Sequence, residues 1–314
     1  MKTILKLILG LFLITLSAKS FAKGFDYNTL EDKILYIPEY DVNDQYAKKL
    51  MRKGKFEELE DAEAKAEYYN EIWSEAMAQS SYDATPYEIR GFDRKKLVKE
   101  KNAKALLLYF SYDDYGNLFV SLYSTGPKKA QGVATALING LDLSTASDIR
   151  LMMNMLNYAL NDAIELANKD GKVKNADRRS KYKESVVAFG DDLSNKTFLI
   201  TPAKHKKQEK ADQMDAEIKA AIGGWRISKV QFVSDDELEQ LRLEGDENSF
   251  FWKNFNYYTS NPLLTYRINY LFTTNGDEVL FMFIGSKKLK ASKLDNIQKK
   301  LLAKIEKYKK QLSK

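Results

Sequence analysis

The feature that most constrains the fold is a series of predicted elements that occurs twice along the chain. The first series starts with the apolar segment ILYIP at residues 34–38, and the second starts with TFLITP at 197–202. Proline has no backbone N–H and cannot continue a central strand, so each segment is predicted as a strand that ends at its proline. A helix, a short alternating strand and a helix with an acidic start follow each of them. The sequence therefore predicts two copies of one plan.

The first helices of the two copies differ in length. Apolar residues recur at helical spacing over 44–79 in the first copy, where Gly54 is a predicted break. In the second copy the helix covers about 208–222 and ends at the pair Gly223 and Gly224. The next helices start after Asp93 and Ser234, whose side chains can accept hydrogen bonds from the free amides of a first turn.

Three strands and an amphipathic helix complete each copy. The strands are predicted at 105–112, 118–124 and 132–140, and again at 250–258, 265–274 and 278–286. Asn275 and Gly276 favour a two-residue hairpin turn between the last two. The final helices cover 147–168 and 291–310. The predicted fold class is α+β, with two related domains that each contain a mixed sheet of about five strands and the order β-α-β-α-β-β-β-α.

The domain boundaries follow from this repeat. Residues 1–22 are predicted as a signal peptide, 23–168 as the first α+β domain and 188–314 as the second, which ends in a lysine-rich helix. The intervening residues 169–187 are polar and basic and have no hydrophobic period until their end. They are predicted to be a basic linker.

The amino-terminal segment has the three zones of a secretory signal peptide. Lys2 and Lys6 supply the positive end, and residues 5–16 form an apolar core that is too short to span a membrane. Small residues at Ser20 and Ala22 match the positions that the signal peptidase reads, so cleavage is predicted after Ala22. The alternative is an uncleaved amino-terminal anchor.

Composition and charge exclude several chemistries. The chain has no cysteine, which excludes disulfides, thiol nucleophiles and cysteine metal sites. The formal charge is +6, but residues 287–314 contain eleven lysines and only two acidic residues, so the remaining chain is not basic. This distribution argues against a general nucleic-acid binder.

The sequence contains no catalytic or cofactor signature. His205 is the only histidine, and it lies in a lysine-rich segment without an orienting partner nearby in the sequence. No glycine-rich phosphate loop and no G-x-S-x-G element is present. Residues 113–117 could be a calcium loop, but their spacing favours an ordinary turn. No catalytic residue, metal ligand or cofactor is therefore predicted, and the sequence favours a non-enzymatic protein.

Two segments are candidates for binding. The aromatic run at 250–258 provides a possible surface for glycan or peptide at Trp252, Phe255, Tyr257 and Tyr258, although one face of such a strand would belong to the core. The lysine-rich helix at 291–310 could lie on an anionic membrane or a partner. Its alternative is an ordinary helix packed on its own sheet, with a solvated basic outer face.

The signal peptide, the ILYIP and FLITP strands and the repeated α+β domains together resemble the uncharacterised exported tandem-domain proteins of Bacteroidota-type bacteria. At the level of the fold, the pattern is similar to the amino-terminal domain of TolB and to the periplasmic domain of the curli secretion channel. This resemblance implies a Gram-negative cell envelope, with the mature protein in the periplasm or secreted.

These observations favour a non-enzymatic periplasmic or outer-membrane-associated binding or scaffold protein. The expected partner is an envelope protein or a glycan, and not a nucleic acid. One alternative is a hydrolase that acts on an envelope polymer through carboxylates brought together by loops. Another is a protein that binds the membrane surface through its basic C-terminal helix.

Overall fold

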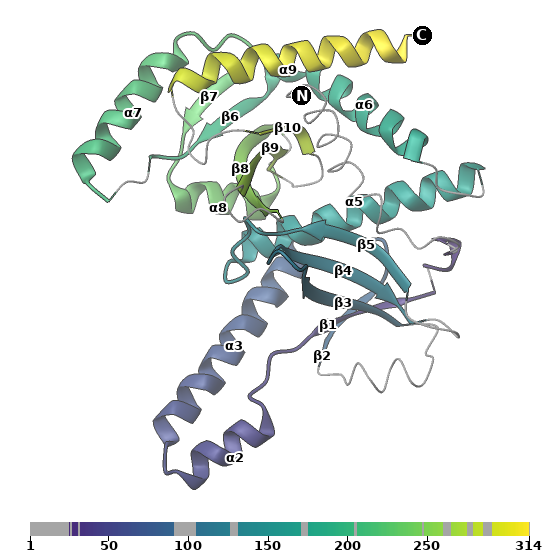
Figure 1. Cartoon of the computed structure of the whole chain (residues 1–314), viewed down its shortest axis with the longest axis vertical. Coiled ribbons are helices and arrows are strands. Elements are labelled where there is room, and N and C mark those ends of the chain that lie inside the picture. Colours follow the sequence, from purple (N-terminus) through teal and green to yellow (C-terminus); the bar gives the residue numbers. More distant parts are fainter. Residues whose placement is uncertain are drawn as a thin grey trace. The chain divides into compact units, whose positions relative to one another are not determined.

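A computed structural model describes residues 25, 27–30, 32–90, 105–125, 131–170, 175–203, 206–246, 248–259, 265–274, 279–284 and 291–313. It confirms the α+β fold class, with two mixed sheets of five strands each (Figure 1). The signal peptide, the helix expected after Asp93, the hairpin turn at Asn275 and His205 lie outside the described residues.

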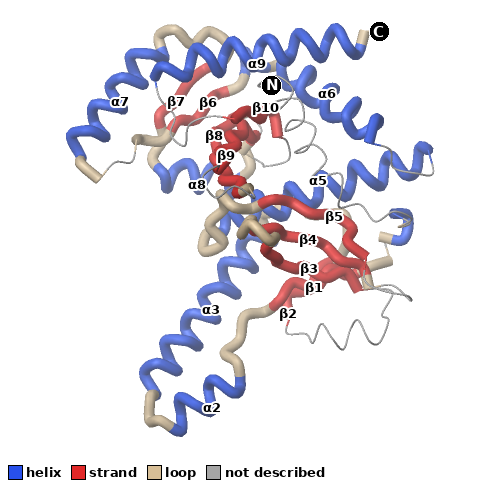
Figure 2. The backbone as a smooth tube through the Cα atoms, viewed as in Figure 1, coloured by secondary structure: helices blue, strands red, loops and turns tan. Residues whose placement is uncertain are grey.

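The chain divides into two compact units. The first comprises Met1–Tyr112, Leu118–Leu137 and Asp142–Ile164. The second comprises Asp113–Asn117, Ile138–Leu141 and Glu165–Lys314. In each unit, helices separate the first two strands and follow the last one (Figure 2).

The first sheet has the strand order β2-β1-β3-β4-β5. Strand β1 lies parallel to β2 and to β3, and β3, β4 and β5 are antiparallel neighbours. Pro38 is the last residue of β1, as its missing N–H requires. The elements of this part of the chain are η1 (Tyr27–Thr29), β1 (Ile34–Pro38), α2 (Asp44–Arg52), α3 (Phe56–Ala78), β2 (Tyr87–Arg90), β3 (Ala105–Tyr112), β4 (Leu118–Ser124), β5 (Gln131–Leu137) and α5 (Ala146–Asp170).

The predicted helix over 44–79 is two helices, α2 and α3. Gly54 separates them with a φ of 66°, a left-handed conformation that glycine adopts without steric cost. Asn43 starts α2, because its side chain accepts hydrogen bonds from the backbone amides of Gln45 and Tyr46. The predicted break at Gly54 is thus confirmed.

Helix α5 holds the segment that joins α3 to β2. Its buried face includes Met152, Met153 and Leu156. Asn154 accepts a hydrogen bond from the backbone of Ser81, and Asn157 accepts from the backbone of Ala84. These amide side chains satisfy backbone groups that no strand or helix pairs.

The second sheet repeats the arrangement of the first. Its order is β10-β9-β8-β6-β7, in which β6 lies parallel to β7 and β8 while β8, β9 and β10 are antiparallel. Read from the other edge, this is the order of the first sheet. The elements are α6 (Asn175–Asp191), η2 (Leu193–Asn195), β6 (Thr197–Ile200), α7 (Gln208–Ile222), β7 (Lys229–Phe232), α8 (Asp235–Glu244), β8 (Ser249–Tyr258), β9 (Thr265–Thr273), β10 (Val279–Ile284) and α9 (Ala291–Leu312).

Helices α6, α7 and α9 supply one core of the second unit together with β6, β8 and β9. Phe198 of β6 stacks on Phe250 of β8 at 5.0 Å and on Trp225 at 5.1 Å. The apolar side of α9 is buried in this cluster through Leu294, Ile297, Leu301 and Ile305. The C-terminal helix therefore packs on its own unit. This is the second of the two interpretations of residues 291–310, an ordinary helix packed on its own sheet.

Residues 169–187, predicted as a linker, include most of helix α6. Val186 and Phe189 of this helix are buried in the core of the second unit, and Phe189 contacts the ring of Phe250 edge-on at 5.4 Å. Much of the polar segment therefore belongs to a packed helix. Within the described ranges, no helix combines the length and the apolar composition needed to cross a membrane.

Candidate functional site

The aromatic residues that the sequence singled out on β8 do not form one surface. Phe255 is 1% exposed, and its ring packs edge-on against Tyr270 at 5.1 Å. Trp252 is half-buried and packs against the core that α6, α7 and α9 share with the sheet. Because successive residues of a strand point to opposite faces, Trp252 and Phe255 lie on different sides of the sheet.

The other two residues of this group are more accessible. Tyr258 is 39% exposed at the end of β8. Tyr257 is half-buried, and burial raises the pKa of its hydroxyl. The prediction that the four residues share one binding surface is therefore wrong for Phe255, which belongs to the core. The ring of Tyr258 remains accessible.

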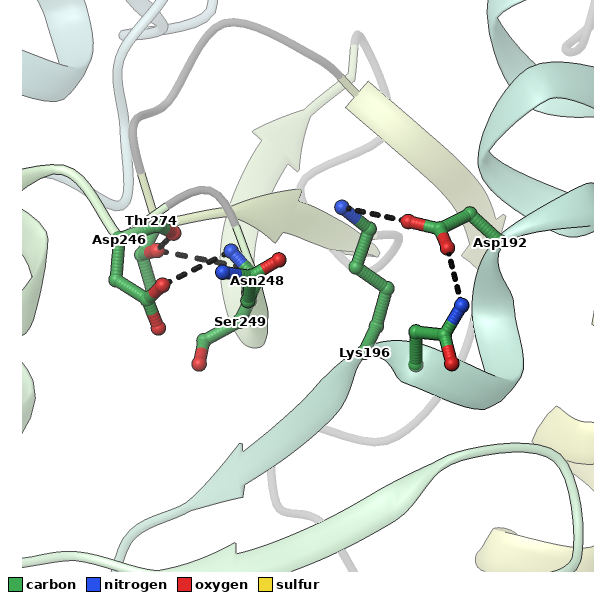
Figure 3. Close-up of polar contacts among 7 residues, drawn as sticks. Asp192, Lys196, Asp246, Asn248, Ser249 and Thr274 are labelled. Carbon is green, nitrogen blue, oxygen red and sulfur yellow. Dashed lines mark hydrogen bonds and ion pairs between the residues drawn. The ribbon is translucent and has the colours of Figure 1, made fainter.

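A cluster of polar side chains that includes a serine, a lysine and two aspartates lies where β6 and β8 begin (Figure 3). Lys196 forms an ion pair with Asp192, with 3.0 Å between Nζ and Oδ2. Asn195 donates a hydrogen bond to the same carboxylate at 2.7 Å. These two contacts, that of Asn195 first, lower the pKa of Asp192.

The second half of this cluster forms a separate network. Thr274 donates from its hydroxyl to the backbone oxygens of Asp246 and Ser249, and Asp246 accepts from the backbone amide of Asn248. Figure 3 shows the ammonium of Lys196 directed toward Asp192 and away from Ser249. A nucleophilic serine needs a base within hydrogen-bond reach, so the contacts seen here close the turn before β8 and do not activate Ser249.

The turn at 113–117 is explained by its own hydrogen bonds. Asp113 Oδ1 accepts from the backbone amides of Tyr115 and Asn117 at 2.9 Å each. Gly116 has a φ of 82°, which suits a tight turn. The carboxylate of Asp113 thus accepts the hydrogen bonds that close the turn. This agrees with the interpretation of residues 113–117 as an ordinary turn. Across the part of the chain that the structure describes, no group of three acidic or histidine side chains is arranged to hold a metal ion.

Lys304, a half-buried lysine of α9, has a pKa in the range of an activated amine. Burial lowers this pKa to about 8. Its Nζ donates a hydrogen bond to the hydroxyl of Tyr182 at 2.8 Å and lies over the rings of Tyr182 and Tyr308. These contacts place the amine between α6 and α9, where it joins the two helices.

A further candidate surface lies on the helical hairpin formed by α2 and the first half of α3, residues 43–71, which we call the arm. Figure 1 shows α2 and the start of α3 reaching away from the strands of the first sheet. All residues of the arm are described, and Leu50 is the only one that is buried. Farther along α3, Ile72 and Trp73 enter the core of the first unit.

The middle of α3 is attached to the segment that follows β1. The side chain of Asn70 accepts a hydrogen bond from the backbone amide of Tyr40 at 2.8 Å and donates one to its carbonyl at 2.9 Å. The rings of Tyr40 and Tyr69 stack at 5.1 Å. This attachment fixes the direction in which the arm leaves the first unit, while the arm residues before it, apart from Leu50, are solvent-exposed or half-buried.

The end of the arm, residues 46–56, combines exposed apolar side chains with positive charge; we call it the tip. Phe56 is 60% exposed, and Tyr46 and Met51 are each 47% exposed. The same eleven residues contain five exposed cationic side chains and no acidic one: Lys48, Lys49, Arg52, Lys53 and Lys55. Helix α3 behind the tip is the opposite, with eight acidic residues and one lysine.

The sequence contained part of this signal. Phe56, Leu59, Ala66, Tyr69, Trp73 and Met77 recur near helical spacing, which predicted an apolar side of α3. The pattern could not show where along α3 the exposed part ends and the buried part begins, because the apolar residues have the same spacing in both parts. Comparison of the chain with protein-family models, with curated proteins and with solved structures finds no match.

Proposed function

We propose that this chain is an exported, non-enzymatic binding or scaffold protein of the bacterial cell envelope, and that the arm is its docking element. The observation that carries the proposal is the exposure of Tyr46, Met51 and Phe56 at the tip. Aromatic and methionine side chains are enriched at binding interfaces, because they bury much surface on contact. Phenylalanine and methionine are among the side chains most often buried in globular proteins.

The limited core of the arm supports the same role. An isolated helix of fewer than about 12–15 residues is marginal in water, and α2 has nine residues. Its stability depends on burial, and Leu50 is its only buried side chain. A partner that covers the tip would supply the burial that the rest of the chain does not provide.

Export and a tandem arrangement are parts of the same proposal. The charged end, apolar core and small residues before position 23 favour secretion to the periplasm or beyond. The equal strand order and pairing of the two sheets support an origin of both units from one ancestral domain. A scaffold of this kind would use its two sheets as framework and the arm as the contact with the envelope.

The test is crosslinking of the tagged mature protein in its own cell envelope, followed by mass spectrometry of the proteins held. The wild type is compared with the double variant Met51→Ser, Phe56→Ser, and with Tyr112→Ser as control, because Tyr112 is 72% exposed and lies outside the arm. We expect the wild type and the control to hold the same envelope components, and the tip variant to lose them.

Recovery of the wild-type protein without any partner protein, together with an absence of binding to envelope membranes, would contradict the binding role. Retention of all partners by the tip variant would remove the arm from the proposal and leave the scaffold role to another surface. Turnover of an envelope polymer by the purified protein would instead favour the hydrolase alternative, and a substrate screen on the same preparation distinguishes that outcome.

A further inference from the structure

The tip of the arm has the composition of a surface that contacts phospholipid headgroups. Lys48, Lys49, Arg52, Lys53 and Lys55 surround the turn at Gly54, and Met51 and Phe56 project among them. Cations near an anionic bilayer are attracted to its surface, and exposed apolar side chains insert at the boundary between headgroups and acyl chains. We propose that the tip docks on an anionic phospholipid bilayer. This inference rests on the proposed docking role of the arm and names its partner.

The charge distribution along the arm sets how deep and in what orientation it can dock. Glu57, Glu58, Glu60 and Asp61 follow directly after Phe56 and are all exposed. An anionic surface attracts the tip and repels this part of α3, so the arm cannot lie flat along the membrane. The contact is therefore restricted to the tip, with α3 held away from the headgroups.

One ion pair marks the boundary between these two regions. Lys55 contacts Glu58 at 2.5 Å, and both side chains are about half exposed. This pair lies in α3's first turn, where acidic residues are favoured by the partial positive charge of the helix amino end. The remaining cations of the tip, on α2 and in the turn, are thus the ones that face an approaching bilayer; Phe56 follows them as the first residue of α3.

The basic C-terminal helix fits a membrane surface less well. Its apolar side chains Leu294, Ile297, Leu301 and Ile305 are buried in the core of the second unit. Lys299, Lys307 and Lys310 remain exposed. Between residues 299 and 310, Leu302 is the one large apolar side chain that is exposed with them. An amphipathic helix binds a bilayer through its apolar face, and the apolar face of α9 is already occupied.

The experiment measures co-sedimentation of the mature protein with vesicles of phosphatidylcholine alone and with vesicles that also contain phosphatidylglycerol. We expect binding to the anionic vesicles, weakened by salt. The variant Lys49→Ser, Lys53→Ser should lower the partition coefficient at least about tenfold, since each cation near such a surface contributes about fivefold. The variant Lys307→Ser, Lys310→Ser removes the same charge from α9 and should bind as the wild type does.

Insertion of the tip is measured separately from electrostatic attraction. The variant Phe56→Trp places an indole at the tip, and Tyr112→Trp places one at an exposed site outside the arm. We expect a blue shift of the fluorescence and quenching by brominated acyl chains at position 56 but not at position 112. The variant Met51→Ser, Phe56→Ser, which keeps every cation, should weaken binding and show that the apolar side chains contribute.

Each contrary result has a defined meaning. Absence of binding to anionic vesicles, or equal binding by the wild type and the Lys49→Ser, Lys53→Ser variant, overturns the inference. Loss of binding in the Lys307→Ser, Lys310→Ser variant alone would assign the membrane contact to α9 and also overturns it. If vesicle binding fails while envelope proteins are still captured through the tip, the proposed function stands and its partner is a protein. Unchanged circular dichroism and thermal unfolding of all variants exclude misfolding as the cause.

Discussion

Lys304 Nζ donates a hydrogen bond to the hydroxyl of Tyr182 over 2.8 Å and so joins α9 to α6 in the second unit. The same ammonium group lies 5.1 Å from the ring centroid of Tyr182 and 5.7 Å from that of Tyr308. Burial, and less strongly the charge of Lys307, lower the pKa of Lys304 to about 8. A group that titrates near neutral pH thus lies inside the contact between two helices.

We expect the free energy of unfolding to rise between about pH 8 and pH 10. Folded Lys304 loses its proton near pH 8, whereas in the unfolded chain it keeps the proton up to the ordinary lysine pKa of 10.5. The unfolded state therefore binds more protons in this window, and stability increases with pH. Lys304→Met should lack this part of the rise, about 1–3 kcal/mol. Urea unfolding at both ends of the window measures it.

Two points make the pH measurement specific. Lys310→Met is the control, because Lys310 is exposed on the same helix and does not contribute to the pKa shift of Lys304, so its replacement should leave the rise in place. Burial raises the pKa of Tyr308, so the unfolded chain loses the tyrosine proton first and stability falls as the pH rises through the ordinary tyrosine pKa of 10.0. The comparison is therefore kept below about pH 10. Equal pH dependence in the wild type and in Lys304→Met would contradict the assignment.

Gly190→Ala should destabilise the second unit. A Cβ at position 190 would lie 2.6 Å from Cγ2 of Ile305, closer than atoms can approach without displacement. Ile305 of α9 is buried in the core, so relief of the clash requires this side chain to leave its packed position or α6 and α9 to move apart, at a cost of about 1–3 kcal/mol. Thermal unfolding measures the loss. Gly223→Ala is the matched control, since its nearest neighbour is 3.5 Å away, and an equal loss there would refute the explanation.

Asn157→Ala should destabilise the first unit. The side chain of Asn157 accepts hydrogen bonds from the backbone amides of Asp83 and Ala84 and donates one to the carbonyl of Ser81. Alanine leaves the amide of buried Ala84 without this acceptor, at a cost of about 2–3 kcal/mol. Exposed Asn161, which donates a hydrogen bond to Asp83, is the control. Urea unfolding should show a much smaller loss of stability for Asn161→Ala. Equal losses would mean that the hydrogen bonds of Asn157 to the backbone of residues 81–84 are not the cause.

The strands and their succession along the chain could be predicted because their signals are local. The proline at the end of ILYIP, the alternation in YEIR and the break at Gly54 each act within a few residues, and the structure has β1, β2 and the α2–α3 turn at those places. Ser234 likewise caps α8 by accepting a hydrogen bond from the amide of Glu237 at 3.0 Å. Such features follow from backbone chemistry that the neighbouring residues determine.

The surfaces could not be predicted, because burial depends on elements distant in the sequence. Phe56 and Trp73 fall on the same predicted apolar side of α3, yet the first is exposed and the second is buried. On β8, alternation implied that one aromatic face looks outward, but the guanidinium of Arg242 from α8 covers the ring of Phe251 at 4.8 Å. In 169–187 the charged majority concealed Val186, which anchors α6 in the core.

The arm should unfold locally, well below the free energy of global unfolding. Asn43 caps α2 by accepting hydrogen bonds from the amides of Gln45 and Tyr46, and its replacement by alanine costs about 1 kcal/mol of helix stability. Since Leu50 is the buried residue of α2, little else holds this helix. Asn43→Ala should therefore accelerate hydrogen exchange of the α2 amides about fivefold without changing the thermal unfolding temperature.

Asn43→Asp is the control for this measurement, because aspartate accepts the same two hydrogen bonds and should leave exchange in α2 close to that of the wild type. Anionic vesicles should slow exchange in both proteins, because docking of the tip stabilises the folded helix by mass action. If the α2 amides of the free wild type instead exchange only through global unfolding, the arm is stable without a partner. In that case the argument that a surface completes its core fails, whatever the tip binds.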